Sequence, residues 1–110
     1  MIYLDNSATT RQHEQVTDTM LTYMREDFGN PSSLYSLGIT AEKAVKEARK
    51  KVIKAMGKNE GAVYFTSGGT EADSMAIFGA AMARKRRGRG IVTSKVEHPA
   101  VLEALSLIHI

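Results

Sequence analysis

The sequence predicts an α/β protein with a mostly parallel sheet, of which these 110 residues form the opening part. Two observations predict this class. Apolar residues recur at helical spacing in several stretches, and two short runs of strand-forming residues, 62–66 and 91–94, flank the helical stretch 70–86. A strand, a helix and a second strand in this order form a βαβ unit, whose parallel strands need helical cover on both faces.

The first helix is predicted over residues 13–27. Val16, Met20 and Met24 recur there at the spacing of one helix face, and the segment 29–31, Gly-Asn-Pro, stops the pattern. The polar residues 32–37 that follow show no periodicity, so we expect an irregular connection.

A longer apolar face, with charged residues opposite it, predicts a second helix over residues 38–56. Gly57 stands where a glycine commonly ends a helix. Glu42 and Lys46 are placed for a favourable i,i+4 ion pair. The helix after the second strand is expected to begin after Pro99.

Composition narrows the class of protein. The chain has 43% hydrophobic and 25% charged residues, no cysteine and a net charge of +3. No apolar run reaches the roughly 18 residues of a membrane span, and the first residues do not resemble a signal peptide. We therefore expect a cytoplasmic protein with no metal site and no membrane partner. The basic run 84–89 coincides with a predicted helix end, so a solvated surface is favoured over nucleic-acid binding.

Two strands cannot complete a parallel sheet, because their edges and apolar faces would stay uncovered. We therefore expect a truncated domain: residues 1–12 form an N-terminal segment, and residues 13–110 form the N-terminal part of a large α/β domain. The apolar end of the chain, residues 106–110, adds to this expectation.

A glycine-rich junction between the first strand and its helix is the most informative segment for function. Backbone N–H groups at a helix start bind anions, glycines allow close approach, and the Thr70 hydroxyl can donate to a phosphate oxygen. The alternative is a purely structural capping box made by Thr70 and Asp73. Neither the triphosphate-binding loop nor the dinucleotide motif matches, so any cofactor would carry a smaller phosphate.

His98 follows the second predicted strand, at the edge where open parallel sheets bind ligands. A histidine there can move protons near neutral pH or lie flat on an aromatic cofactor. The alternative is an ordinary surface histidine at a strand exit. Lys95 lies close by and is expected to be a solvated surface lysine.

Four segments together, YLDNSATT, GNPSS, FTSGGTEAD and VTSKVEHPAVLE, resemble the N-terminal part of cysteine desulfurases over residues 2–103. Those enzymes depend on pyridoxal 5′-phosphate and belong to the class V aminotransferases. The resemblance implies the major domain of the aspartate-aminotransferase-like fold, called fold type I, here incomplete.

The resemblance also implies roles for individual residues. Gly69 and Thr70 correspond to the family residues that hold the cofactor phosphate. His98 corresponds to the histidine that stacks on the pyridine ring and takes part in proton transfer. The residues that correspond to positions near the active-site entrance are Asn6, Ala8 and Thr9. The loop 29–33 matches a segment near the dimer interface of the family.

The implied reaction removes sulfur from L-cysteine and leaves L-alanine, for iron–sulfur cluster or related biosynthesis. The implied enzyme is a homodimer that can pass sulfur to an acceptor protein. The lysine that binds the cofactor and the cysteine that accepts sulfur are absent here, so these 110 residues alone are expected to be inactive. Two alternatives remain open: a related enzyme such as a selenocysteine lyase, or a phosphate-binding module without catalysis.

Overall fold

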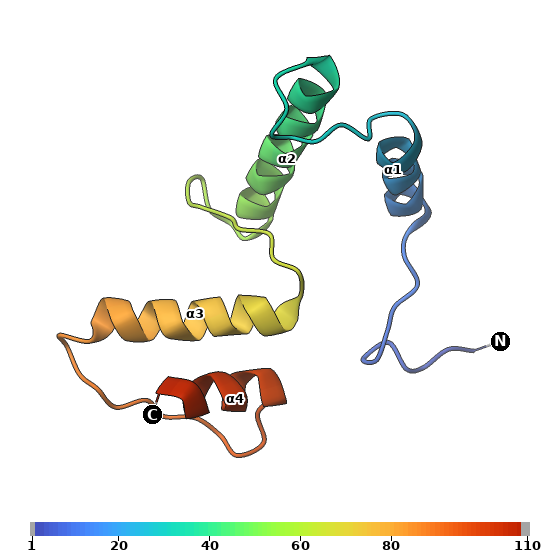
Figure 1. Ribbon diagram of the computed structural model, residues 1–110. Helices are drawn as coiled ribbons and strands as arrows, with labels where there is room; N and C mark the ends of the chain where they lie inside the picture. Colours follow the sequence, from blue (N-terminus) through green and yellow to red (C-terminus); the bar gives the residue numbers. More distant parts are fainter. Residues whose placement is uncertain (1, 109–110) are drawn as a thin grey trace. The chain divides into compact units, whose positions relative to one another are not determined.

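The computed structural model describes residues 2–108, which are built from helices and irregular connections. Four helices follow one another along this part of the chain (Figure 1): α1 (Glu14–Arg25), α2 (Ser36–Ala55), α3 (Gly69–Arg84) and α4 (Pro99–Ile108). The chain divides into two compact units, of which the first ends at Val63 and the second begins at Tyr64. None of the helices within residues 2–108 is long and apolar enough to cross a membrane.

The predicted helices are confirmed, with ends that differ by one or two residues from those expected. α1 has no buried residue, and its apolar stripe of Val16, Met20 and Met24 is exposed. α2 begins at Ser36, so the end of the stretch expected to be irregular already belongs to the helix. The predicted pair of Glu42 and Lys46 is present with an N–O distance of 2.6 Å.

α2 ends as its glycine predicts. The Gly57 N–H donates to the Lys54 carbonyl at 3.0 Å, and the Lys58 N–H donates to the Ile53 carbonyl at 3.1 Å. This pair of bonds is the Schellman motif, which requires a left-handed residue at the position after the cap. Gly57 has a φ of 70°, a conformation that glycine adopts without the steric cost of a Cβ atom.

The connection between α1 and α2 packs closely against the first turn of α2. The Asn30 carboxamide oxygen accepts from the Ser32 N–H at 2.9 Å, and the Asn30 carbonyl accepts from the Ser33 N–H at 2.9 Å. Gly38 is buried beneath this turn. A Cβ atom at Gly38 would lie 2.8 Å from the Asn30 carbonyl oxygen and closer still to that of Ser33. Only a glycine lets the loop approach the helix this closely.

The second unit is a pair of helices in contact. α3 and α4 lie side by side and run in the same direction, as the progression of colour along each helix shows (Figure 1). The buried residues of α4 are Ala100, Ala104 and Leu105, which share one face of the helix. The two alanines allow close approach of the helices, and Leu105 supplies the largest of these buried side chains.

The predicted strands do not form. Residues 62–66 and 91–94 carry no strand assignment, and the described residues 2–108 contain no β ladder. Burial was also expected for these segments, yet Phe65 is 56% exposed and Val92 is 100% exposed. A helix forms its hydrogen bonds within its own segment, whereas a strand needs a partner that is distant in sequence. Neither segment has such a partner within the described residues.

Candidate functional site

The start of α3 presents free backbone donors. The residue before the helix is Gly68, with an extended φ of 174°, and no side chain caps the helix there. The first N–H groups of any helix have no acceptor inside the helix, so those of Gly69 and Thr70 are open to an external one. A Cβ atom added at Gly68 or Gly69 would meet nothing within 4 Å, so the space beside this backbone is open.

The Thr70 hydroxyl is also available at this helix start. Thr70 is exposed, and its hydroxyl makes no hydrogen bond to any residue of the described range 2–108. Two N–H groups, a hydroxyl and open space are what an anion such as phosphate requires at a helix N-terminus. The arrangement therefore has the chemistry of an anion site.

The alternative for this segment, a capping box of Thr70 and Asp73, is wrong. The residue before α3 is Gly68, so the helix begins two residues earlier than that motif requires and Thr70 lies inside the first turn. Glu71 instead holds the segment before the helix: its carboxylate oxygen Oε2 accepts from the Ser67 N–H at 2.7 Å and from the Ser67 hydroxyl at 2.6 Å. The sequence signal was the Ser-Gly-Gly-Thr-Glu run itself, in which the cap lies at the first glycine, two residues before Thr70.

The Glu71 carboxylate is acidified by these bonds. The hydroxyl and the backbone N–H of Ser67 hold the pKa of Glu71 below its usual value. A carboxylate whose pKa is lower in the folded state than in the unfolded state stabilises the folded state. This contribution is complete when the pH is above the unfolded-state pKa, and it is lost as the pH falls through the folded-state pKa.

We therefore expect Glu71→Gln to lower the stability of α3 at pH 7, and to lower it by less at pH 3. Urea unfolding followed by circular dichroism at both pH values measures this. Glu103→Gln is the matched control, because Glu103 is exposed and makes no hydrogen bond or ion pair with residues 2–108. An equal loss at both pH values for Glu71→Gln would contradict the assigned role of the carboxylate.

His98 lies at the start of α4. Its carbonyl oxygen accepts from the Val101 N–H at 2.9 Å and from the Leu102 N–H at 3.3 Å. Its ring atom Nδ1 accepts from the Ala100 N–H at 3.1 Å. His98 is therefore the cap of α4 as well as an exposed imidazole. Sequence reasoning missed the capping role, although Pro99 at the first position of a helix is a known start signal.

The two predicted parts of the site lie at one end of the second unit. Because α3 and α4 run in the same direction, both N-termini are at the same end of the pair (Figure 1). Gly69 and Thr70 begin one helix and His98 precedes the other. No hydrogen bond joins His98 to either of them among the residues described, so the three groups border this end without contacting one another through polar atoms.

Asn6, Ala8 and Thr9 lie in the first unit, within or beside a turn. The N–H groups of Ala8 and Thr9 donate to the Asp5 carbonyl at 3.1 and 3.4 Å. The Tyr3 hydroxyl donates to the Thr9 carbonyl at 2.8 Å. All are exposed, and their bonds are those of a local turn. Their proposed place beside the substrate stays a prediction.

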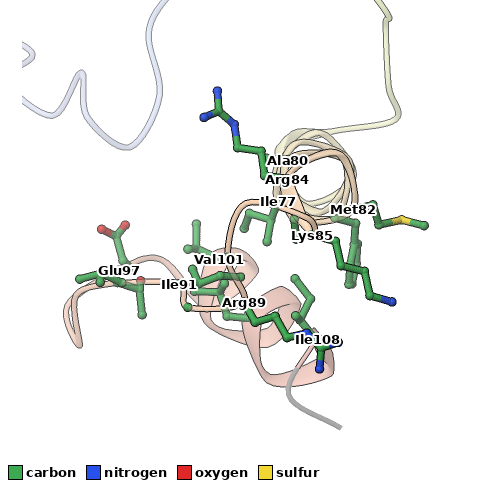
Figure 2. Close-up of a pocket in the computed structure, with 17 residues that line it drawn as sticks. Ile77, Ala80, Met82, Arg84, Lys85, Arg89, Ile91, Glu97, Val101 and Ile108 are labelled. Carbon is green, nitrogen blue, oxygen red and sulfur yellow. The ribbon is translucent and has the colours of Figure 1, made fainter.

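A cavity of about 820 Å³ lies between α3, α4 and their connection, away from the predicted residues (Figure 2). Its walls are largely apolar and include Ile77, Ile91 and Val101, while Arg84 and Arg89 border it. Gly69, Thr70 and His98 do not line it. Sequence reasoning missed this cavity. The available signal was the apolar spacing on the facing sides of the two helices, which indicates a packing surface.

Comparison with known proteins defines the class. Residues 2–109 match the aminotransferase class-V family, and the chain belongs to that family. It is 52% identical over 101 residues to the cysteine desulfurase IscS of Methanosarcina thermophila, covering 92% of this chain and 25% of the relative. Identity to the cysteine desulfurase NifS of Azotobacter vinelandii is 47% over 102 residues, again 92% of this chain and 25% of the relative.

The chain is also similar to the solved structure of a NifS-like protein. It matches 98% of this chain and 30% of its own length, with a TM-score of 0.85 and 37% sequence identity. The chain thus spans about a quarter of the length of the curated relatives it matches. The resemblance to cysteine desulfurases that the four sequence segments indicate is confirmed.

Proposed function

We propose that this chain supplies the phosphate-binding helix start and the ring-stacking histidine of a pyridoxal-phosphate-dependent cysteine desulfurase. The observation that carries the proposal is the uncapped start of α3, where backbone donors and the unpartnered Thr70 hydroxyl adjoin open space. The names of the relatives support the activity, since those described above are cysteine desulfurases.

The residues present fit pyridoxal phosphate. The Gly69 N–H and the Thr70 N–H and hydroxyl would bind its phosphate, and the His98 ring would lie on its pyridine ring at the same end of the helix pair. When bound, pyridoxal phosphate supplies an electron sink next to the reacting amino acid. His98 would hold or move a proton there, and Glu71 would keep the Ser67 backbone in place beside the phosphate.

The proposal also extends to the complete enzyme. It would release L-alanine from L-cysteine and pass the sulfur on, as a cytoplasmic homodimer, to an acceptor protein. Residues 62–66 and 91–94 would become strands of its parallel sheet, and Asn6, Ala8 and Thr9 would lie on the substrate side. The names of the relatives favour this reading over a selenocysteine lyase or a phosphate-binding module without catalysis.

Binding of pyridoxine 5′-phosphate to the chain tests the phosphate site. This compound has the phosphate and ring of the cofactor but no aldehyde, so it does not react with surface lysines. We expect saturable binding by calorimetry, with amide shifts at Gly69 and Thr70 in nuclear magnetic resonance spectra. Removing the hydroxyl in Thr70→Val is expected to weaken binding about tenfold, the usual cost of losing a bond to a charged group.

Ser74→Ala is the matched control, because it removes a hydroxyl one turn further along α3. It is expected to bind as the original chain does. Circular dichroism checks that each variant retains its helices. Absence of saturable binding, or equal weakening by both variants, would refute the assignment of the phosphate to this helix start.

A further inference from the structure

The ring of His98 is engaged at one nitrogen only. Nδ1 accepts from the Ala100 N–H at 3.1 Å in a partly buried bond, and Nε2 has no partner among residues 2–108. Ala100 itself is 6% exposed. Its N–H belongs to the first turn of α4, where the helix provides no acceptor, so losing Nδ1 would leave this donor poorly satisfied.

A backbone N–H always donates, so Nδ1 must offer its lone pair. In a neutral imidazole the single ring proton then resides on Nε2. We infer that α4 fixes His98 in the Nε2–H tautomer, so that the free nitrogen of the ring is a hydrogen-bond donor and Nδ1 is the only nitrogen able to take up a proton.

This tautomer has a consequence for the proposed reaction, and that consequence rests on the proposed function. Toward a ligand, the neutral ring would act as a donor through Nε2. Any proton that His98 accepts would have to enter at Nδ1 and displace the bond from Ala100. Proton uptake by His98 and side-chain capping of α4 are therefore mutually exclusive, which makes α4 a positioning element for the ring.

The tautomer can be measured on the chain without any ligand. With ring-nitrogen-labelled histidine, long-range proton–nitrogen spectra report which nitrogen carries the proton. We expect His98 to be in the Nε2–H form with a scalar coupling from Nδ1 to the Ala100 amide nitrogen. His13 is an internal control, because it caps α1 without any side-chain hydrogen bond and should show no such coupling.

Substitutions at His98 test whether its side chain protects the Ala100 amide through the capping hydrogen bond. His98→Ala is expected to speed hydrogen exchange of the Ala100 amide about fivefold, whereas His98→Asn should restore protection because asparagine also caps helices. His13→Ala should leave exchange in α1 unchanged. A dominant Nδ1–H form of His98, or a missing coupling together with unchanged exchange in His98→Ala, would overturn the inference. Failure to bind pyridoxine 5′-phosphate would instead refute the proposed function and leave the tautomer intact.

Discussion

Leu105→Ala is expected to lower the free energy of unfolding of the helix pair by about 2 kcal/mol, near the lower end for buried leucines. Leu105 is 7% exposed and lies on the face of α4 that contacts α3. Truncation removes apolar contact between the helices and enlarges the void there. The loss is smaller than in a fully packed core, because Leu105 already borders the cavity.

Leu107→Ala provides a control with the same chemical change on the same helix. Leu107 is 62% exposed, so its truncation should alter stability by less than about 0.5 kcal/mol. Urea unfolding followed by far-ultraviolet circular dichroism compares the two variants. Equal losses would mean that the α3–α4 contact contributes nothing specific to stability.

Gly38→Ala is expected to destabilise the first unit by about 1–2 kcal/mol, even though alanine favours helices over glycine. The new Cβ would collide with the Ser33 and Asn30 carbonyl oxygens, which belong to backbone and not to adaptable side chains. Either the loop moves away from α2 or the first turn of α2 unwinds, and both outcomes lose the close packing of the loop against Gly38.

Gly79→Ala is the control of opposite sign. Gly79 lies inside α3, and a Cβ atom there would meet nothing within 4 Å. The substitution should therefore stabilise the chain by about 0.5–1 kcal/mol through helix propensity alone. Thermal and urea unfolding of the two variants should move in opposite directions. A stabilised Gly38→Ala variant would contradict the close approach of the loop.

The helices were predictable because their determinants are local. Apolar spacing locates α2, and Gly57 marks its end through a left-handed conformation that other residues avoid. The strands were not predictable in the same way. Val92 and Phe65 have strong strand preferences, but a strand forms only when a distant segment pairs with it, and the described residues provide none.

For the candidate site residues, the positions were more predictable than the hydrogen bonds. The glycine-rich junction and His98 do border one end of the helix pair, which the alternation of elements anticipated. The bonds that hold them were missed. Ser67 pairs with Glu71 and not Thr70 with Asp73, and the ring of His98 bonds to its own helix. Such choices depend on shifts of one or two residues at a helix start, which propensity does not resolve.

The connection from α3 to α4, residues 85–98, determines whether His98 can share an end with Thr70. To start α4 beside the start of α3, the chain must travel back along a helix of 16 residues, about 24 Å. A fully extended chain needs roughly eight residues for that distance, so the connection has a reserve of several residues. Small deletions in its basic part should be tolerated. Longer deletions, which leave too few residues to span the length of α3, would force α4 to run antiparallel to α3. His98 would then lie at the opposite end of the pair.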